Sequence, residues 1–374
     1  MTVVGRSPLR VTHVVFDFNG GGLETLVAEL AARFVGTPTR VSLVTLSGRV
    51  GRLGEATRDR FDQFHVVRPV RGVSMLLPLG LARVIRQTRA DVVHVHTGSW
   101  YKGALAARLA GVSRVVYTEH GREHDDPRFK QWLDRRAARF TTDVVAVSGR
   151  LARYMATDVG IDPAKIRTIH NGVDTTAFTP GAASVDYRSS LGIPPDSLVI
   201  GSVGRLESVK AYEHLLTAAA MIRTKLSRSF VVVVAGDGTQ RAPLEEQARQ
   251  LGISDMVRLP GWTDQPVRTH RLFDVFVLPS RSEGQSVSLM EAMACGAAPV
   301  VTDVGSNAEM LGPALKDYVV PADRPEALAD ALLRVLSPGA PLAAIRSEVR
   351  QRVVDLYSLD RMTEEYDRLY RGIR

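Results

Sequence analysis

The sequence predicts an α/β protein with two parallel sheets, each covered by helices. Its 374 residues exceed what one hydrophobic core usually contains, so two domains are expected. Short apolar runs alternate with helical segments, which is typical of parallel sheets joined by crossover helices. The alternation stops in residues 175–197, which are rich in proline, glycine and serine, and then restarts. We therefore expect domains over residues 1–185 and 186–354, with a final helix at about 355–374 that packs back on the first domain.

The composition is that of a globular protein with a basic surface. Hydrophobic residues make up 45% of the chain, and the formal net charge is +8. A basic balance suits anionic partners such as nucleotide diphosphates, nucleic acid or an anionic membrane, although a solvated surface also explains it. Cys295 is the only cysteine, the first residues lack an apolar signal region, and no run approaches the roughly 20 apolar residues of a membrane span. We expect a cytoplasmic protein and leave peripheral membrane contact open.

The first half opens with a strand, a glycine turn and a helix. Residues 11–18 are apolar, Gly20, Gly21 and Gly22 follow, and residues 23–34 have helical spacing. The dinucleotide pattern G-x-G-x-x-G is not met, because Thr25 stands at the third glycine position. The glycines either permit a tight turn or let the backbone approach a ligand closely. Further strands are expected at 41–46, 64–67, 91–95, 114–118, 143–147 and 165–169, and further helices at 76–89, 100–110, 129–140 and 149–159.

Two basic segments of this half could face an anionic partner. Residues 47–60 are rich in glycine and arginine and are expected to form a loop. The helix at 76–89 carries Arg83, Arg86 and Arg89, which are three apart and therefore lie roughly on one side. A solvated face and a membrane-surface face both remain open for this helix.

Three histidines lie on or after strands of the first half. His94 and His96 are two apart on one strand, so their side chains share a face, but no third ligand has a spacing that indicates a metal site. We therefore predict no metal. His120 directly follows the next strand, and ligands in open α/β sheets bind beyond the carboxyl ends of strands. It is either a ligand-binding histidine or a structural one.

The second half repeats the alternation. Strands are expected at 198–203, 230–235, 257–259, 273–278, 298–302 and 318–320, and helices from 210, at 243–251, after 286, at 325–336 and within 345–370. Gly204 and Arg205 follow the first of these strands, and Lys210 comes five residues after Arg205. Two cations at a strand end could neutralise a diphosphate and stabilise the negative charge that develops on it as a leaving group.

Residues 279–309 contain the most informative pattern. Glu283 precedes a helix and Glu291 lies eight residues later, so the two carboxylates can line the same side of a cleft. The first helical turn offers unpaired backbone amides that suit a phosphate. Carboxylates accept hydrogen bonds from hydroxyls, as a ribose and a sugar would offer. Taken alone, the stretch is by default a strand–helix–strand turn with solvated glutamates.

The two sheets are expected to face each other across a cleft at the carboxyl ends of their strands. His120 and the Gly20 turn would enter it from one domain. Arg205, Lys210, Glu283 and Glu291 would enter from the other.

Over nearly its whole length the chain resembles a retaining glycosyltransferase of the GT-B fold, of the type called family 4. The motifs that carry the resemblance are GGLE, DVVHVH, YTEHG, VAVS, HNGVDTTAF, GSVGRLESVK, VAGDGTQRAPLE, LPGWTD and PSRSEGQSVSLMEAMACGAAPVVTDVGSNAE, in this order. Two features depart from the family: Ala211 stands where many members have glycine, and residues 47–74 match no motif.

The resemblance implies roles for individual residues. Glu283 would contact hydroxyls of the donor sugar and Glu291 would hold the ribose. Arg205 and Lys210 would bind the diphosphate, and His120 would contact the 6-hydroxyl of the sugar. The remaining donor-binding residues would be Gly21, Gly22, Gly204, Gly284, Gln285, Ser286 and Val287, and the catalytic group would comprise His120, Arg205, Lys210 and Glu283.

The resemblance also implies an activity. Front-face attack assisted by the leaving phosphate would retain the anomeric configuration, without a metal or other cofactor, and a UDP-sugar is favoured over a GDP-sugar. The expected acceptor is a saccharide or a lipid-linked saccharide in surface polysaccharide assembly, and nucleic acid is not an expected partner. Open alternatives are a small natural-product acceptor, a nucleotide-sugar epimerase and, least favoured, a NAD-dependent oxidoreductase or a binding protein without activity.

Overall fold

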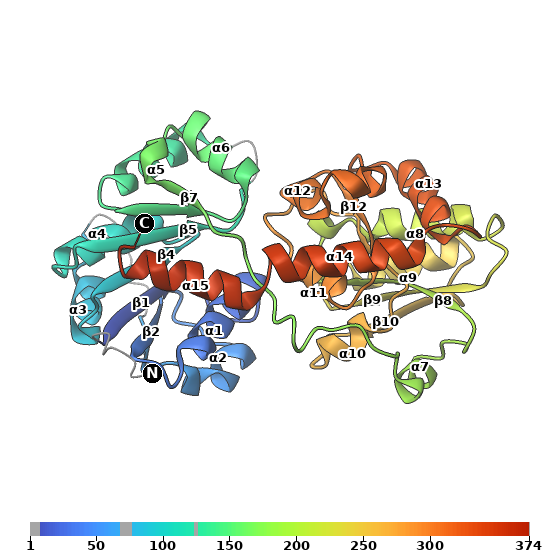
Figure 1. Ribbon diagram of the computed structural model, residues 1–374, viewed down its shortest axis with the longest axis horizontal. Helices are drawn as coiled ribbons and strands as arrows, with labels where there is room; N and C mark the ends of the chain where they lie inside the picture. The colour runs from blue at the N-terminus through green and yellow to red at the C-terminus, as the bar shows by residue number, and fades with distance from the viewer. Residues whose placement is uncertain (1–7, 68–76, 123–125, 374) are drawn as a thin grey trace. The chain divides into compact units, whose positions relative to one another are not determined.

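A computed structural model shows two compact units, each built on a parallel sheet (Figure 1). It describes residues 8–67, 77–122 and 126–373. The first unit comprises Met1–Asn171 with Leu359–Arg374, and the second comprises Gly172–Ser358. The predicted fold class, two α/β domains with parallel sheets, is confirmed.

The first unit contains, within the described residues, a seven-stranded sheet with the order β3-β2-β1-β4-β5-β6-β7. All neighbouring strands in it are parallel, so their carboxyl ends share one edge. The central strands are buried on both faces, which explains their continuous apolar runs. The strands are β1 (Leu9–Val15), β2 (Thr39–Thr45), β3 (Gln63–Val66), β4 (Val92–His96), β5 (Arg114–Glu119), β6 (Asp143–Ala146) and β7 (Ile166–Thr168).

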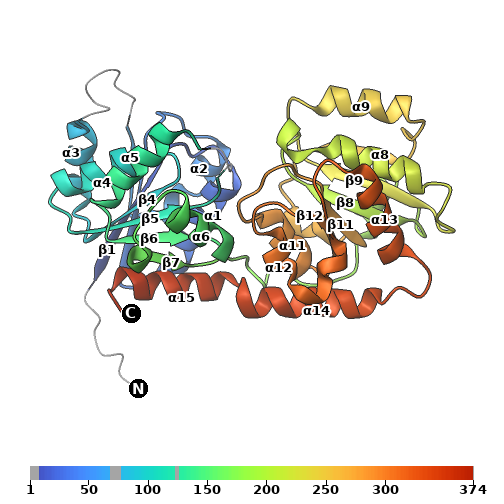
Figure 2. The same ribbon diagram turned by 90° about the horizontal axis from the view of Figure 1, so that it is seen from above.

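Helices cover both faces of this sheet. The helices are α1 (Gly22–Phe34), α2 (Arg52–Ala56), α3 (Leu79–Thr88), α4 (Trp100–Leu109), α5 (Arg128–Ala138), α6 (Gly149–Thr157) and α15 (Leu359–Tyr370). α4 packs between α3 and α5, and α15 packs against α1 (Figure 2). The last helix thus belongs to the first unit, and two buried hydroxyls of α15 tie it to the sheet: Tyr370 bonds His94, and Tyr366 bonds Thr118.

The second unit contains a six-stranded parallel sheet with the order β10-β9-β8-β11-β12-β13. The order reverses direction between β8 and β11, and ligands of open α/β sheets commonly bind at such a switch point. The strands are β8 (Leu198–Val203), β9 (Phe230–Ala235), β10 (Val257–Gly261), β11 (Val275–Leu278), β12 (Ala298–Thr302) and β13 (Val319–Val320).

The helices of the second unit also lie on both faces of its sheet. α8 packs against α9 and α13, and α11 packs against α14. One buried apolar cluster, which includes Val232, Phe276 and Met290, joins sheet and helices. The helices are α7 (Val185–Ser190), α8 (Tyr212–Ile222), α9 (Arg241–Gln250), α10 (Pro266–His270), α11 (Val287–Ala294), α12 (Asn307–Leu311), α13 (Pro325–Leu336) and α14 (Leu342–Leu356).

The division between the units comes earlier in the chain than the expected boundary after residue 185. Phe178 and Ala183 pack against the core of the second unit. Arg350 on α14 donates hydrogen bonds to the carbonyl oxygens of Phe178 and Thr175. These contacts assign the start of the expected linker to the second unit. α7 also forms within it, because the Ser184 side chain caps its first turn by accepting from the Tyr187 N–H.

Several expected local structures differ from those observed. The expected loop at 47–60 contains α2 and a 3-10 turn, Arg58–Arg60, and the expected helix start at residue 76 lies outside the described residues. Lys210 ends a 3-10 turn rather than opening α8. Between them lies Ala211, with φ of 51° in the left-handed region. A glycine adopts that conformation without steric cost, which gives a physical reason for glycine at this position in many family members.

Among the described residues, none of the helices is both long enough and apolar enough to cross a membrane.

Candidate functional site

The start of α11 forms the centre of the candidate site in the second unit. α11 follows β11 through a short polar turn, and Ser286 is its N-cap. The Ser286 hydroxyl accepts a hydrogen bond from the Leu289 N–H at 3.3 Å. Ser286 and Gln285 are buried, whereas Gly284 is partly exposed. The first amides of α11 therefore lie at a partly open helix start, where the helix dipole favours an anion.

Glu283 lies directly before this helix start and is held by two partners. The Lys210 ammonium contacts Glu283 Oε1 at 2.7 Å, and the Ser280 hydroxyl donates to the same oxygen at 2.6 Å. The side chains of Lys210 and Glu283 are 17% and 9% exposed. Both bonds go to Oε1, so Oε2 and two further ammonium donors of Lys210 are available for a ligand.

The backbone around Glu283 rests on a second loop, which follows β12. Gly305 has φ of 54°, and a Cβ added there would lie 2.3 Å from the carbonyl oxygen of Glu283. Ser306 donates to the Gly284 carbonyl through both its backbone N–H, at 3.0 Å, and its hydroxyl, at 2.9 Å. Gly305 therefore permits the close approach that fixes Glu283 and Gly284 before the helix.

Gly204 and Arg205 leave the end of β8 under a similar constraint. A Cβ at Gly236, which has φ of 152°, would lie 1.9 Å from the Gly204 carbonyl oxygen. The Leu206 N–H donates to the Asp237 carbonyl at 2.9 Å, so the loop after β8 is hydrogen-bonded to the loop after β9. The Arg205 side chain is exposed, and it forms no hydrogen bond within the described part of the chain. Its guanidinium is thus a cation at the strand end with its donors unused.

Glu291 lies inside α11 and pairs with a histidine. Its Oε2 is 3.0 Å from His270 Nε2, and the side chain of His270 is fully buried while that of Glu291 is 14% exposed. His270 ends α10 and packs edge-on against Phe178 and Phe273. A rigid, buried histidine therefore orients the Glu291 carboxylate and leaves Oε1 for a hydroxyl-bearing ligand.

In the first unit, His120 follows β5 and is held by its backbone and its ring. Its N–H donates to Thr97 Oγ1 at 2.9 Å, and its Nε2 lies 3.0 Å from His96 Nδ1. Thr97 in turn donates to Glu119 at 2.8 Å. Burial lowers the pKa of His120 to about 4, so the ring is neutral at pH 7.

The residues just before and after His120 are anchored by a buried ion-pair cluster. The Arg122 guanidinium contacts Glu119 at 2.6 Å, and Asp126 and Asp134 at 2.7 Å each. All four side chains are less than one-tenth exposed. Three buried carboxylates around one arginine fix the strand end that presents His120.

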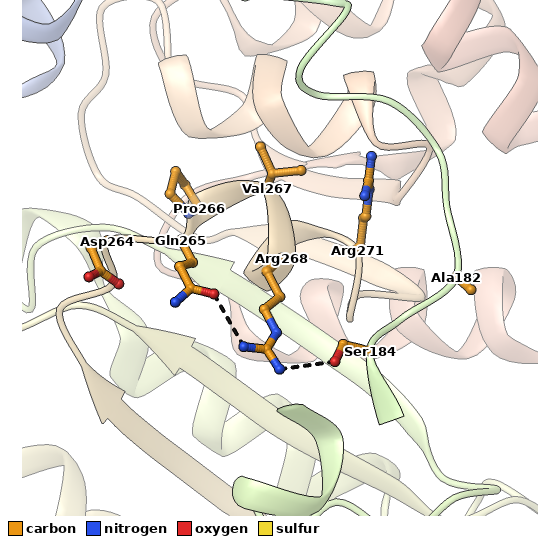
Figure 3. A pocket seen from close by; sticks show the side chains of 8 residues that line it. All are labelled: Ala182, Ser184, Asp264, Gln265, Pro266, Val267, Arg268 and Arg271. Carbon is orange, nitrogen blue, oxygen red and sulfur yellow. Dashed lines mark hydrogen bonds between the residues drawn. The ribbon is translucent and has the colours of Figure 1, made fainter. Parts of the chain in front are cut away.

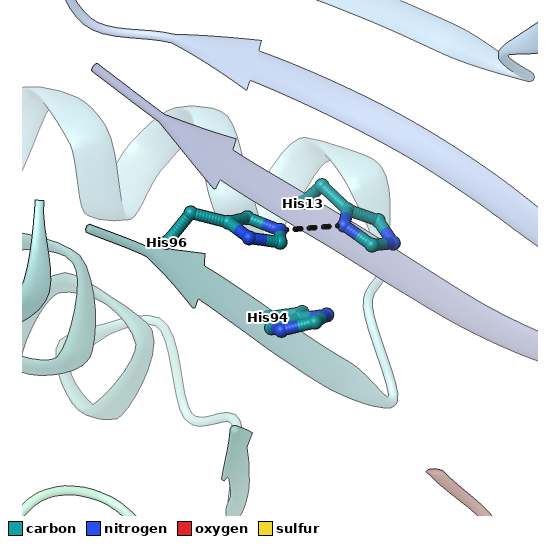
Figure 4. A group of neighbouring side chains, drawn as sticks. All are labelled: His13, His94 and His96. Carbon is teal, nitrogen blue, oxygen red and sulfur yellow. Dashed lines mark hydrogen bonds between the residues drawn. The ribbon is translucent and has the colours of Figure 1, made fainter. Parts of the chain in front are cut away.

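His94 and His96 do lie close together, and a third histidine joins them from β1. Figure 4 shows His13, His94 and His96, which offer ring nitrogens within 4.8 Å of one another. The spacing of the sequence around His94 and His96 gave no sign of this third residue, because His13 comes from a strand more than 80 positions earlier. All three are buried.

The glycine turn after β1 leads directly into α1. Gly20 has φ of 126°, a conformation that favours glycine, and Gly21 is the N-cap residue of α1, which starts at Gly22. A Cβ at Gly21 would lie 2.5 Å from Glu24 Oε2. Both possibilities left open by the sequence are consistent with this geometry: the turn is tight, and its amides open a helix.

The structure thus groups the predicted residues of the second unit around two structural features. Glu283, Lys210 and the start of α11 lie together, and Arg205 leaves the neighbouring strand β8. His120 and the glycine turn belong to the first unit. The assignment of all these residues to a donor site stays a prediction.

Sequence reasoning missed the residues that hold the site in place. These are Ser280, Gly305 and Ser306 around Glu283, Gly236 beneath Gly204, and His270 beside Glu291. All of these except His270 lay inside recognised motifs without an assigned role. Only the fold reveals what His270 contacts, since it lies 21 positions before Glu291.

A separate hollow of about 440 Å³ lies beside α10 (Figure 3). Arg268 spans it, donating to Gln265 Oε1 at 3.2 Å and to Ser184 Oγ at 3.0 Å. The hollow is lined by Ala182, Ser184, Asp264, Gln265, Pro266, Val267, Arg268 and Arg271. It includes none of the predicted donor-site residues, so we assign it no function.

Comparison with known families matches both halves of the chain. Residues 20–177 match the family described as Glycosyltransferase Family 4, and residues 185–352 match Glycosyl transferases group 1. A D-inositol 3-phosphate glycosyltransferase of Actinosynnema mirum is 31% identical over 299 residues, which cover 73% of this chain and 70% of that protein. The UDP-Gal:alpha-D-GlcNAc-diphosphoundecaprenol alpha-1,3-galactosyltransferase of Escherichia coli is 27% identical over 334 residues, 86% of either chain.

Solved structures agree on the fold. The crystal structure of HepE from Anabaena in complex with UDP superposes with a TM-score of 0.85 at 18% identity, covering 97% of this chain and 100% of that one. A glycosyltransferase from Rickettsia africae gives a TM-score of 0.82 at 20% identity, covering 98% and 99%. At this level of identity, the likeness establishes the GT-B fold.

Proposed function

The chain belongs to the family 4 glycosyltransferases, and from this premise we propose that it transfers a sugar from a UDP-sugar to a saccharide or lipid-linked saccharide with retention of anomeric configuration. The observation that carries the proposal is the arrangement of Ser280, Glu283 and Lys210 immediately before the start of α11. It combines a charged acceptor, a cation and free helix amides at one point of the second unit. The charged acceptor suits the sugar hydroxyls, and the cation and the helix amides suit the diphosphate and the oxygen that bridges it to the sugar.

Each proposed role combines what the family resemblance implies with the chemistry of the group. Arg205 and Lys210 bind the diphosphate together with the amides of Ser286 and Val287, and they stabilise the charge that builds on it as the sugar leaves. Glu283 accepts hydrogen bonds from sugar hydroxyls, with Gly284 and Gln285 beside it. Gly204 allows the backbone near Arg205 to approach the phosphates.

The other half of the donor is held by different groups. Glu291, oriented by His270, accepts from the ribose hydroxyls. In the first unit, His120 contacts the 6-hydroxyl of the sugar, and Gly21 and Gly22 lie near phosphate and acceptor. In this scheme Glu283 positions the sugar and forms no covalent bond.

Retention in this scheme needs no protein nucleophile and no metal. The acceptor hydroxyl attacks the anomeric carbon from the face that the diphosphate leaves, and the departing phosphate oxygen takes the proton of that hydroxyl. Two cations and a helix start supply positive charge where a metal ion would otherwise be required. We propose metal-independent catalysis on this ground.

The reaction is tested by the configuration of its product. The protein is incubated with UDP-glucose, UDP-galactose or UDP-N-acetylglucosamine and a polyprenyl-diphosphate-linked saccharide, with and without EDTA. An α-linked product from the α-linked donor, with a rate unaffected by EDTA, is the expected result. A β-linked product contradicts retention, and loss of activity in EDTA contradicts metal independence. Interconversion of the donor without acceptor would instead identify an epimerase.

Two kinds of acceptor are suggested by the relatives. The Escherichia coli relative is named for a diphosphoundecaprenol-linked sugar, which supports a lipid-linked saccharide as acceptor and a role in surface or exopolysaccharide assembly. The Actinosynnema mirum relative is named for D-inositol 3-phosphate, which supports a small acceptor instead. Parallel assays with both acceptors decide between them, because transfer to only the small acceptor would exclude the assembly role.

A lipid-linked acceptor would place the enzyme at a membrane surface, and α5 is the element best suited to contact it. Phe129 and Trp132 are 71% and 44% exposed and stack on each other at 5.9 Å. Arg136 lies over the Trp132 ring at 4.8 Å. The acid of this helix, Asp134, is buried against Arg122, so the outward face is aromatic and cationic. The exposed basic residues on or just after α5 are Arg128, Lys130, Arg135, Arg136 and Arg139.

This combination matches the interface of an anionic bilayer. Aromatic side chains insert at the headgroup level, and each nearby cation adds about 1 kcal/mol of attraction to anionic lipid. The helix that the sequence suggested for this role is α3, where Leu79 is 62% exposed and Arg83 is exposed. Its Arg86 donates to the Leu109 carbonyl, and Arg89 lies beyond its end. We therefore propose α5 as the main contact, while a cytoplasmic location stays a prediction.

Vesicle sedimentation tests the contact. The wild type is expected to bind vesicles containing phosphatidylglycerol and to release them at high salt. A Phe129→Ser/Trp132→Ser variant should bind at least tenfold more weakly. Trp262→Ser, which removes an aromatic side chain that is 66% exposed in the second unit, is the control and should bind normally. If Leu79→Ser lost binding while the α5 variant bound normally, the membrane contact would be assigned to α3. Equal binding of all variants and the wild type would contradict membrane contact through either helix.

A further inference from the structure

A row of buried histidines connects the interior of the first sheet to His120. His13 Nδ1 lies 2.9 Å from His96 Nε2, and His96 Nδ1 lies 3.0 Å from His120 Nε2. The three rings stack with centroids 5.2 and 5.3 Å apart. They come from β1, from β4 and from the end of β5, which are neighbours in the sheet. Figure 4 shows the first of these two hydrogen bonds.

Each ring in this row carries a single N–H at pH 7. Burial lowers the pKa of His13 to about 3 and that of His120 to about 4, and it lowers the pKa of His96 well below its usual value. A neutral imidazole has one donor nitrogen and one acceptor nitrogen. The two hydrogen bonds of the row must therefore run in the same direction, and only two arrangements exist.

In the outward arrangement, His13 Nδ1–H donates to His96, and His96 Nδ1–H donates to His120 Nε2. The remaining N–H of the row is then Nδ1–H of His120, at the carboxyl end of β5. In the inward arrangement, His120 Nε2–H donates to His96, and the remaining N–H is Nε2–H of His13. His13 is fully buried, and its Nε2 has no partner among the described residues.

The two arrangements differ in where they leave an unpaired donor. A buried N–H without an acceptor destabilises the fold, and no acceptor reaches the His13 end of the row within the described residues. His120 Nδ1 is also buried and without a partner among the described residues, but it follows a strand end, where ligands bind. A hydroxyl oxygen of a ligand would be the acceptor that satisfies it.

We infer that His13 and His96 are positioning residues, which hold His120 in the Nδ1–H tautomer so that it donates a hydrogen bond to a hydroxyl oxygen of the donor sugar. The direction of the row rests on the position of its two ends, since only the His120 end follows a strand end, where a ligand acceptor can bind. The identity of that acceptor as a sugar hydroxyl rests on the proposed function.

His94 lies against this row but belongs to a different network. Its Nδ1 bonds the Tyr370 hydroxyl and its Nε2 bonds Thr118 Oγ1, both at 2.7 Å. Both ring nitrogens are therefore engaged, and the residue ties α15 to the sheet.

A metal ion held by His13, His94 and His96 is the competing explanation. Two histidines on one tetrahedral zinc ion hold their ligand nitrogens roughly 3.3 Å apart, because each lies about 2.0–2.1 Å from the metal. The 2.9 Å separation of His13 Nδ1 and His96 Nε2 is that of a direct hydrogen bond. With His94 also fully bonded, the hydrogen-bonded row accounts for the geometry.

The tautomers can be measured without any substrate. In protein labelled with ¹⁵N-histidine, two-bond ¹H–¹⁵N correlation spectra distinguish Nδ1–H from Nε2–H for each ring. The expected result is Nδ1–H for His13, His96 and His120. Nε2–H at His120, or stoichiometric zinc or iron in elemental analysis of the purified protein, would overturn the inference.

Variants of His13 test whether the row sets His120. His13→Asn retains an amide N–H that can donate to His96, whereas His13→Phe fills similar space without a donor. Asn should preserve the Nδ1–H tautomer of His120, and Phe should produce a mixture. His65→Gln, a partly exposed histidine bonded to Gln63, is the control and should change nothing.

Binding measurements then separate the inference from the proposed function. With UDP-glucose in calorimetry, His13→Phe should weaken the donor about tenfold, and His13→Asn should restore most of the affinity. UDP alone, which lacks the sugar, should bind all variants equally. An altered tautomer in His13→Phe with unchanged UDP-glucose affinity would refute the positioning role. Absence of any nucleotide-sugar binding by the wild type would count against the proposed function, while the tautomers would still decide the direction of the row.

Discussion

At the scale of single residues, the charge of Glu283 is what the proposed site depends on most. Glu283→Gln keeps the size and the bond from Ser280 but removes the negative charge that faces Lys210. Transfer should fall on the order of 100-fold in kcat/KM, about 2.7 kcal/mol of transition-state stabilisation. The measurement is the initial rate of transfer at subsaturating donor.

Glu245→Gln is the matched control for this change. Glu245 lies on α9, is 55% exposed and pairs with Arg241 at 3.2 Å. Exposed ion pairs of this kind contribute little to the free energy of unfolding, so activity and melting temperature should stay unchanged in Glu245→Gln. Normal transfer by Glu283→Gln would show that this carboxylate does not contact the sugar.

The residue types of the candidate site were readable from the sequence, whereas their supports were not. Glu283 and Glu291 could be singled out by their spacing across a helix start, and the family resemblance gave them their roles. His270 and Ser280 were assigned no role from the sequence, although Ser280 lies inside a recognised motif. Their role arises from contacts between segments that only the folded chain brings together.

At the scale of elements, the loops at the strand ends depend on glycines that admit no side chain. Gly236→Ala would place a Cβ 1.9 Å from the Gly204 carbonyl oxygen and would force the loop that carries Arg205 to move. We expect a loss of about 3 kcal/mol or more in the free energy of unfolding, together with weaker UDP binding. Denaturant unfolding and calorimetry measure the two effects.

Gly252→Ala separates steric clash from backbone strain. Gly252 also has positive φ, 66°, but a Cβ there would meet nothing within 4 Å. Its substitution should cost only about 1–2 kcal/mol of left-handed strain and leave UDP binding intact. Equal losses in both variants would mean that contact with Gly204 does not matter.

Element prediction succeeded where the pattern was long and failed where it was short. β8, β9, β12 and α13 begin and end as expected, because their apolar runs or helical periods are unbroken. α2, α7 and α10 have five or six residues and carry no clear period. α7 forms in a segment rich in proline and glycine because tertiary packing and a serine cap outweigh composition.

At the scale of the whole molecule, buried histidines make the stability of the first unit depend on pH. Burial lowers the pKa of His13 to about 3 and of His120 to about 4, and it lowers the pKa of His94 and His96 well below 6.5. Below pH 6.5 the unfolded chain binds protons that the folded unit does not, so stability is full above this pH and is lost as the pH falls toward the folded pKa values.

From pH 6.5 to 5.5 each such histidine should cost about 1 kcal/mol, or up to about 4 kcal/mol for the four. Burial raises the pKa of Asp134, so the folded unit binds this proton more readily than the unfolded chain does. That effect opposes the loss of stability from the histidines, but only at lower pH. Urea unfolding followed by tryptophan fluorescence in a Trp262→Phe background reports the first unit, which holds Trp100 and Trp132. A free energy of unfolding that does not change between these two pH values would contradict the burial of neutral histidines.

The architecture of the whole chain was predictable, because two rounds of strand and helix leave few alternatives for a chain of this length. The division between the units was less so. Residues 172–185 have no periodic pattern, and the packing of Phe178 and the bonds from Arg350, far along the chain, assign them to the second unit.

A nucleotide-sugar site in the second unit is tested by a thermal-shift panel with UDP, GDP, ADP, dTDP and NAD on the wild type and on Arg205→Ala. A ligand that binds only the folded state raises the melting temperature by mass action. We expect the largest shift with UDP and its loss in Arg205→Ala, whose guanidinium is exposed and makes no hydrogen bond within the described residues. A shift with NAD alone, or a UDP shift of equal size in Arg205→Ala, would contradict a nucleotide-sugar site built on the strand ends of the second unit.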